Sequence, residues 1–192
     1  MSRDIRGACA LYYSYQVRGV DGRIKVPFRR RTAHSFLKAY VTFLYVKFGR
    51  ATAQSTNDTA NVSRSIAHDE KMTTTAAAAG STVGLVVGTG TTAVAFTDVA
   101  LVTQIAHGSS ASQLQYGASV VNNPSSDGTS TSMIMTRDFS NASGGSITVR
   151  EIGIYSQISS GNRIFCTVRD LATIVLADGD VLTLNYIFKT TA

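Results

Sequence analysis

The sequence predicts a mainly β protein: an antiparallel β-sandwich, jelly-roll-like in character, preceded by one β-hairpin and one amphipathic helix. Three observations support this prediction. Aromatic and β-branched residues recur in short runs, which favour strands. Clusters of Gly, Ser, Asn and Asp separate these runs, as they do in sandwiches and barrels. Hydrophobic residues make up 44% of the 192 residues and charged residues only 16%, which is ordinary for a chain that buries a core.

The first expected element is a β-hairpin. The runs LYYSYQVRGV (11–20) and RIKVPF (23–28) flank Asp21-Gly22. Asp-Gly favours a tight hairpin turn, because both turn residues must adopt a positive φ. Pro27 has no amide proton to donate, so the second strand is expected to lie at the edge of a sheet or to end there.

An amphipathic helix is expected next, near residues 33–48. Thr32 or Ser35 would cap its start, and Gly49 would end it. Helical spacing places one apolar stripe on this segment, made of Phe36, Leu37, Tyr40, Val41, Leu44 and Phe48. The stripe must pack on something, either the chain's own sheet or a neighbouring subunit.

Composition and charge divide the chain into three predicted parts. Residues 1–50 carry eleven Lys or Arg and two Asp, a net charge of +9, and are expected to form a basic arm of hairpin and helix. Residues 51–82 are rich in Ser, Thr and Ala and predict an extended connector, with one short strand around 62–67. Residues 51–192 together carry seven Lys or Arg and ten Asp or Glu, a net charge of −3, and residues 83–192 predict the β-sandwich.

The third part predicts a succession of strands. They are expected at 83–88, 93–96, 99–106, 113–121, 131–140, 146–156, 163–169 and 181–189. The turn residues from Asn141 to Gly145 predict a hairpin between 132–140 and 146–156. Gly153 predicts a bulge or a close approach of another segment. Alternation in the last strand predicts a core face of Leu182, Leu184, Tyr186 and Phe188.

Residues 88–93, Gly-Thr-Gly-Thr-Thr-Ala, fit the G-x-G-x-x-[GA] pattern of dinucleotide-binding loops. Such a loop needs a helix after it and an acidic residue about 20 positions further on. The following residues are β-branched and carry no helical stripe, and no acidic residue lies between Asp98 and Asp127. We therefore interpret the stretch as a tight turn at the entry to the β domain and expect no nucleotide or other cofactor.

The titratable residues form no recognisable reaction centre. The histidines and the two cysteines lie apart from one another, without metal-ligand spacing: His34, His68, His107, Cys9 and Cys166. We expect both cysteines to be buried free thiols. Asp178-Gly179-Asp180 lacks the remaining acidic positions of a calcium loop and predicts a hairpin turn. The sequence therefore predicts neither an enzyme nor a metal site.

The densest basic run is Arg29-Arg30-Arg31, with further cations at Lys25, Lys38, Lys47 and Arg50. Three interpretations remain open for it: docking onto an acidic protein partner, a plain solvated surface, or contact with a nucleic-acid backbone. Together with the apolar stripe, this run gives the candidate docking residues, namely Arg29, Arg30, Arg31, Phe36, Tyr40, Leu44 and Phe48.

Six motifs follow one another in the part of the chain from Gly84 onward. The motifs are GLVVGTGTTAVAFTDVALVTQIAHG, QLQYGASVV, RDFSN, SGGSITVREIGIYS, FCTVRDL and GDVLTLNYIF, preceded by the basic segment and the helix from Ser35 to Tyr45. In these features the chain resembles a family of tailed-bacteriophage structural proteins, over most of its length apart from the connector. The strand from Ile147 to Tyr155 is also similar to a strand of phage tail-fibre attachment domains.

The resemblance implies a non-enzymatic virion component, present in many symmetric copies and assembled in the host cytoplasm. Two positions on the particle stay open: a tail or neck protein that attaches a fibre or appendage, and a capsid decoration (cement) protein. Implied partners are further copies of the chain and other proteins of the tail, neck, portal-proximal region or capsid, with nucleic acid as a third, weaker alternative. The family supplies no catalytic motif, so no site residue is transferred from it.

Hydropathy gives no reason to expect a membrane partner. No run reaches the roughly 18 apolar residues of a membrane-spanning helix. The apolar run near the N-terminus is too short for a signal peptide and is closed by Arg18 and Asp21.

Overall fold

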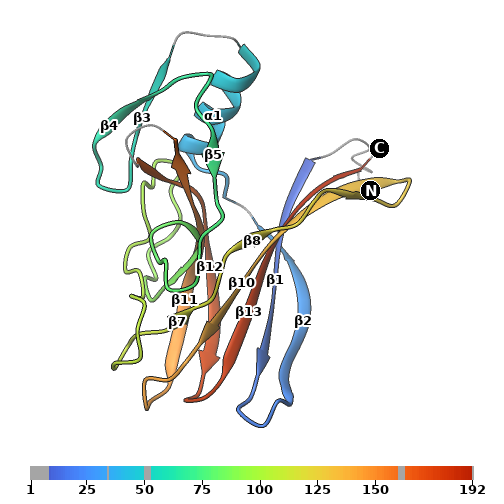
Figure 1. Ribbon diagram of the computed structural model, residues 1–192, viewed down its shortest axis with the longest axis vertical. Coiled ribbons are helices and arrows are strands. Elements are labelled where there is room, and N and C mark those ends of the chain that lie inside the picture. Colours follow the sequence, from blue (N-terminus) through green and yellow to red (C-terminus); the bar gives the residue numbers. More distant parts are fainter. Residues whose placement is uncertain (1–8, 34, 50–52, 160–162, 192) are drawn as a thin grey trace.

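A computed structural model describes residues 9–33, 35–49, 53–159 and 163–191. Two antiparallel sheets, A and B, face each other around the main core, and a helix with a small hairpin lies at one end of sheet B (Figure 1). The prediction of a mainly β chain with one helix is confirmed. His34 and Arg50, which the sequence analysis singled out, lie outside the described residues.

The elements in chain order are β1 (Cys9–Arg18), β2 (Ile24–Thr32), α1 (Lys38–Gly49), β3 (Gln54–Asn57), β4 (Ser63–Ile66), β5 (Met72–Thr73), β6 (Gly84–Gly88), β7 (Gln115–Tyr116), β8 (Val120–Val121), β9 (Ser125–Ser126), β10 (Ser130–Ser140), β11 (Ile147–Ile158), β12 (Ile164–Leu176) and β13 (Val181–Thr191). Sheet A has the order β2-β1-β13-β10, and the short strands β7, β8 and β9 pair with the far edge of β10. Sheet B consists of β12, β11 and, on the other edge of β11, the short strands β5 and β6.

The last strand, β13, lies in the middle of sheet A. It pairs with β1 on one edge and with β10 on the other, each time over its whole length. Leu182, Leu184 and Tyr186 are fully buried against sheet B, and Phe188 packs partly buried against the same core. The core face predicted for this strand is therefore confirmed.

The first hairpin was expected in an arm beside the β domain, but the structure places it inside sheet A. Leu11, Tyr13 and Val17 alternate along β1 and are buried, so this strand has a full core face of its own. The basic character that indicated an arm belongs to β2, which is almost wholly exposed. A turn forms at the predicted place, but it spans residues 19–23, and of Asp21 and Gly22 only Gly22 has a positive φ, at 77°. The prediction that β2 lies at the sheet edge is confirmed.

The hairpin expected through residues 141–145 is wrong. β10 belongs to sheet A and β11 to sheet B, so this turn carries the chain from one sheet to the other. Asn141 fixes the crossing: its Nδ2 donates to the Gly145 carbonyl at 2.8 Å and to the Leu176 carbonyl at 2.9 Å. Turns within a sheet and turns between sheets use the same residue types, and the sequence pattern does not separate them.

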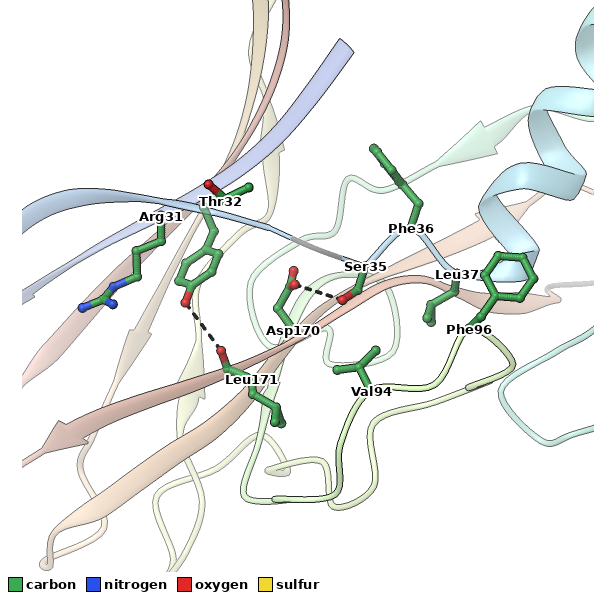
Figure 2. A pocket seen from close by; sticks show the side chains of 10 residues that line it. Arg31, Thr32, Ser35, Phe36, Leu37, Val94, Phe96, Asp170 and Leu171 are labelled. Atoms are coloured by element: carbon green, nitrogen blue, oxygen red, sulfur yellow. Dashed lines mark hydrogen bonds between the residues drawn. The ribbon is translucent and has the colours of Figure 1, made fainter. Parts of the chain in front are cut away.

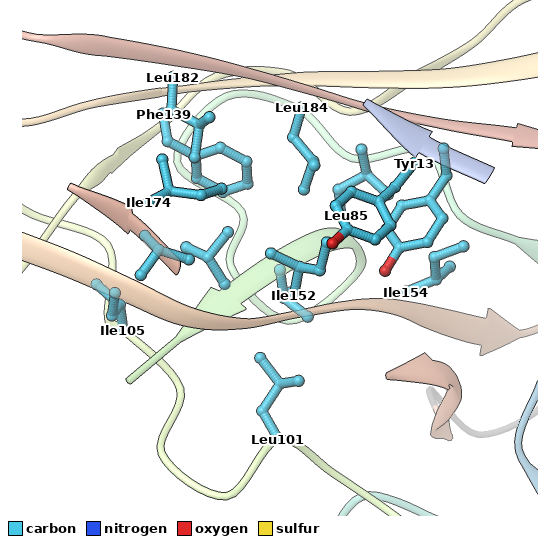
Figure 3. Close-up of a cluster of buried hydrophobic side chains, with 14 of the residues drawn as sticks. Tyr13, Leu85, Leu101, Ile105, Phe139, Ile152, Ile154, Ile174, Leu182 and Leu184 are labelled. Carbon is cyan, nitrogen blue, oxygen red and sulfur yellow. The ribbon is translucent and has the colours of Figure 1, made fainter. Parts of the chain in front are cut away.

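The strands expected at 93–96 and 99–106 are replaced by an irregular segment, residues 89–114, and the strand expected at 113–121 is reduced to the two short strands β7 and β8. The irregular segment covers the outer face of sheet B. Figure 3 shows Leu101 on the opposite side of β11 from Leu182 and Leu184. Gly153 lies close to both β12 and this cover, because a Cβ there would lie 2.7 Å from the Val168 carbonyl oxygen and 3.1 Å from Leu101 Cδ2. The close approach predicted at Gly153 is thus confirmed.

The described part of the connector, residues 53–82, packs against the rest of the chain more closely than its composition predicted. β3 and β4 form a hairpin beside α1, and β4 falls within the strand expected at 62–67. Ile66 is fully buried, in a second small core with Phe43 and Val46 of α1 and Phe165 of β12. One large apolar residue therefore anchors this hairpin between the helix and the end of sheet B.

The helix begins later than predicted, at Lys38, and its end at Gly49 agrees with the prediction. Residues 35–37 run in extended form along β12, where the Leu37 amide donates to the Thr167 carbonyl at 3.0 Å and the Arg169 amide to the Ser35 carbonyl at 3.4 Å. These backbone bonds to a distant strand outweigh the local helix signals. The one helix within the described ranges is too short to cross a lipid bilayer.

Tyr116 of β7 joins sheet A to the irregular segment in the interior. Its ring packs edge-on against Phe139, with centroids 4.8 Å apart, and its hydroxyl donates to the Ile105 carbonyl at 2.6 Å. Burial raises the pKa of the Tyr116 phenol to about 12. The folded chain therefore holds this proton at a pH where the unfolded chain releases it.

Replacing Ile66 with alanine tests whether the connector is packed. We expect the free energy of unfolding to fall by about 2–4 kcal/mol, because the change leaves a cavity among fully buried side chains. Val62, on the same hairpin but 44% exposed, supplies the matched control, and its change to alanine should cost less than about 0.5 kcal/mol. Urea denaturation measures both, and equal effects of the two variants would contradict the packing.

A second prediction concerns alkaline pH. The folded pKa of Tyr116 lies above the unfolded value, so its contribution is complete below the unfolded value of about 10 and is lost as the pH rises toward about 12. This loss amounts to about 2–3 kcal/mol for Tyr116 alone. Urea denaturation between pH 9 and pH 11.5 should show it, and Tyr116→Phe should flatten the pH dependence while removing one buried hydrogen bond. A variant whose stability declines as steeply as that of the parent would contradict the assignment.

Candidate docking surface

The glycine-rich stretch at 88–93 faces inward, onto a buried carboxylate. The Gly90 amide donates to Glu151 Oε1 at 3.0 Å, and the amides of Val102 and Thr103 donate to the same carboxylate at 3.0 and 2.8 Å. A Cβ on Gly90 would lie 2.5 Å from Glu151 Oε1, so glycine is needed for this close approach. In the described residues that follow, 91–159 and 163–191, there is no helix. This geometry supports the interpretation of the stretch as a turn.

Glu151 is paired with Arg169, and both side chains are fully buried. Arg169 Nε donates to Glu151 Oε2 at 2.9 Å, and its Nη1 forms an ion pair with Asp98 at 2.6 Å. Its Nη2 also donates to the Thr92 carbonyl at 2.8 Å. One guanidinium on β12 therefore holds the loop at two places, and this fixes the residues between them, Val94 and Phe96 among these.

The three arginines of the basic run lie exposed on the edge strand β2. Arg30 lies over the Tyr12 ring, 4.7 Å from its centroid. Among the described residues, none of the three forms an ion pair. Lys25 differs, because it pairs with Asp180 at 2.6 Å. Arg29, Arg30 and Arg31 are therefore available to an external anion.

The helix α1 is apolar on two opposite sides. Ala39, Phe43 and Val46 face the chain's own core. The other side carries side chains that are 48%, 36%, 56% and 83% exposed, namely Val41, Leu44, Tyr45 and Phe48. We call these four residues the outer face of α1. Three of the six residues of the predicted stripe, Val41, Leu44 and Phe48, therefore lie on this uncovered side. Of the other three, Leu37 is in the core, and Phe36 and Tyr40 are half-buried and stack on each other with ring centroids 4.2 Å apart.

Between β1–β2 of sheet A and β12 of sheet B the sandwich has a groove of about 630 Å³, which we call the lateral groove (Figure 2). Its lining consists of Tyr13, Arg31, Thr32, Ser35, Phe36, Leu37, Val94, Phe96, Asp170 and Leu171. The carboxylate of Asp170 is 4% exposed and accepts hydrogen bonds from Ser35 Oγ at 3.1 Å and from the Tyr186 hydroxyl at 2.9 Å. This carboxylate is thus committed to internal partners.

Two further hollows extend the lateral groove in both directions. One of about 270 Å³ shares Tyr13, Arg31 and Leu171 with it and reaches Thr173. Another of about 450 Å³ shares Phe96 and reaches Val41 and Tyr45 on the outer face of α1. The basic strand, the groove and the helix therefore form one connected side of the molecule.

The structure brings together some of the sequence-predicted docking residues and separates others. Arg31 and Phe36 line the lateral groove, and Leu44 and Phe48 lie on the outer face of α1. The sequence analysis did not identify Phe96 or Leu171, which are 56% and 42% exposed. Each lies in a run of apolar residues typical of a core strand, so only the tertiary structure shows that the side chain is at the surface.

The remaining candidate reactive groups lie apart. Cys9 is exposed, against the expectation of a buried thiol, because it begins β1 at the end of the strand, whereas Cys166 is fully buried and burial raises the pKa of its thiol. His107 accepts the Tyr116 amide on Nδ1 at 3.0 Å. Asp178-Gly179-Asp180 forms a turn, as expected, but between strands of different sheets. Within the described ranges, no three His, Cys, Asp or Glu side chains gather closely enough to hold a metal ion.

Searches against protein-family models, curated proteins and solved structures found no match to this chain.

Replacing Arg169 with methionine tests whether its ion pair with Glu151 holds the irregular segment, residues 89–114, in place. We expect the free energy of unfolding to fall by about 3–5 kcal/mol, because Glu151 stays buried without its cation. The double variant Glu151→Gln, Arg169→Met should recover part of the loss. The exposed Arg150 is the control, since Arg150→Met should change stability by less than about 0.5 kcal/mol.

Urea denaturation gives these free energies, and hydrogen exchange of the Val102 and Thr103 amides reports the loop directly. If these two amides stayed as protected in the Arg169 variant as in the parent, the ion pair would not be what holds the loop.

Proposed function

We propose that the chain is a non-enzymatic structural component of a tailed-phage virion, a tail or neck protein that attaches a fibre or appendage through symmetric protein–protein contacts. The observation that supports this proposal best is the outer face of α1, with four large apolar side chains that the chain leaves in water. Contiguous apolar patches on a soluble surface mark interaction sites. A short helix that is apolar on both sides suits a protein that packs against itself on one side and a partner on the other.

The charge of β2, whose Arg31 lines the lateral groove, indicates the chemistry of the partner. Arg29, Arg30 and Arg31 carry no internal counter-ion among the described residues, and the N-terminal turn of α1 adds Lys38 and no acidic residue. A partner with an apolar centre and an acidic rim complements this surface, and opposite charges both speed association and fix its orientation. We therefore propose that the docking surface meets an acidic virion protein.

A capsid decoration protein is the alternative within the same class. It would use the same apolar face and the same basic strand, but on the acidic outside of a head. Binding to nucleic acid is the weaker alternative, because the arginines adjoin an apolar helix face that a phosphate backbone does not need.

Copy number and position separate these alternatives. Electron cryo-microscopy of the intact particle should show density for the chain in a ring at the tail or neck, at a few tens of copies or fewer. Hundreds of copies over the head lattice would support the decoration protein instead, and absence of the chain from purified particles would refute both.

The double variant Leu44→Ser, Phe48→Ser tests the outer face of α1. Incorporation into particles should fall at least about tenfold, because these two side chains supply much of the exposed apolar area and a few central residues dominate most interfaces. Gel densitometry against the major capsid protein measures the incorporated amount. The control is Val120→Ser, a 48% exposed apolar residue on β8, which should incorporate normally. Since all three side chains are exposed, thermal melting should stay within a few degrees of the parent, and normal incorporation of the double variant would exclude this face as the docking site.

A further inference from the structure

We propose that the lateral groove binds an extended, acidic segment of a partner protein, which adds to the free edge of β12 and places a carboxylate against Arg31. The proposal rests on the proposed function, since it names the kind of partner segment that the docking surface receives. Three features support it: an unpaired strand edge, an unbalanced charge and exposed apolar side chains along the groove.

The edge of β12 already accepts an extended segment. Residues 35–37 lie along it, with a backbone bond from Leu37 to Thr167 and another from Arg169 to Ser35. Beyond Asp170 no other described strand pairs with this edge, because β12 ends the order of sheet B. The Tyr13 hydroxyl reaches the Leu171 carbonyl at 3.5 Å, the outer limit of a hydrogen bond. A partner segment can therefore continue the pairing that residues 35–37 begin.

The two edges that border the groove differ in how they are protected. β2 carries Pro27 and three exposed arginines, which are the features that keep edge strands from pairing. The stretch of β12 from Leu171 to Val175 carries neither a proline nor a charged residue. A register shift opposite Arg150 limits the pairing to a short stretch. The segment is therefore expected to pair with β12 and to present side chains toward β2.

The charge of the groove selects an acidic segment. Arg31 lines both the lateral groove and the adjoining hollow, and it has no ion-pair partner among the described residues. The one carboxylate in the lining, Asp170, is buried and engaged by Ser35 and Tyr186. A carboxylate of the partner would give Arg31 the bidentate contact that a guanidinium favours.

The apolar lining supplies the rest of the contact. Phe96 and Leu171 are 56% and 42% exposed, and Figure 2 shows them toward the two ends of the groove with Val94 between them. Alternate side chains of an extended segment point to opposite sides, so apolar side chains can fill the groove while acidic ones face Arg31. The segment should therefore alternate acidic and apolar residues.

The test is a selection from a random library of displayed dodecapeptides on the immobilised full chain. Enriched peptides should carry Asp or Glu beside apolar residues. Synthetic copies of them should bind at least about tenfold more weakly to Arg31→Glu and to Phe96→Ser. A peptide with its acidic residues changed to lysine should bind Arg31→Glu better than the parent chain. Methylation of the peptide's backbone nitrogens should weaken binding, because it removes the strand pairing.

Two controls match these variants in chemistry and lie outside the groove. Arg23→Glu reverses the charge of an arginine whose side chain is 88% exposed at the β1–β2 turn, and Val120→Ser removes an exposed apolar side chain from β8. Neither should change peptide affinity. Phe48→Ser should leave it unchanged as well, so the groove is tested separately from the outer face of α1.

Four outcomes overturn the proposal. No peptide is enriched, the enriched peptides lack acidic residues, the enriched peptides match a segment of this chain, or Arg31→Glu leaves the peptide affinity unchanged. A parallel glycan array adds a fifth, since an oligosaccharide bound by the parent and lost in Phe96→Ser would make the groove a carbohydrate site. The particle experiments judge the proposed function independently, because a chain placed at the tail or neck with a groove that takes no peptide would fail this inference alone.

Discussion

The buried ion pair between Arg169 and Glu151 is the interaction on which the covered face of sheet B depends. A carboxylate with no solvent exposure is stable only if its charge and its lone pairs are satisfied. Arg169 supplies the charge, and three amides from the irregular segment supply the hydrogen bonds. The segment in turn has no regular strand pairing along most of its length, so these bonds define its path. A polar cluster thereby positions an apolar cover, with Leu101 packed on β11.

The same cluster reaches the docking surface through the alternation of β12. Arg169 and Asp170 are neighbours and point to opposite faces, so Arg169 anchors the irregular segment while Asp170 accepts hydrogen bonds from Ser35 and from Tyr186 of sheet A. The first contact fixes the wall of the lateral groove that carries Phe96, and the second fixes its floor. Hydrogen bonds and ion pairs therefore hold both the irregular segment and residues 35–37 against β12, where they line the groove.

Sequence patterns predicted those features of the fold that depend on residues close together in the sequence. The Asp21-Gly22 turn and the core face of β13 follow from turn chemistry and alternation, and both could be predicted. The start of α1 could not, because β12 captures residues 35–37, and β12 lies far away in sequence. The burial of Ile66 and the exposure of Phe96 depend in the same way on partners that only the folded chain supplies. Of the candidate docking surface, the sequence indicated the arginines and the stripe, but not the groove that connects them.

The helix shows why the stripe could be found in the sequence while its environment could not. Periodicity marks an apolar side but does not say what covers it, and α1 has two such sides. The chain's own core takes Ala39, Phe43 and Val46, whereas Tyr45 and Phe48 stay outside. A helix under selection for its own folding alone would turn its largest aromatic residues inward, since their burial contributes most. The stabilisation that Tyr45 and Phe48 can provide is available only when another surface covers them, and this is the argument for a partner.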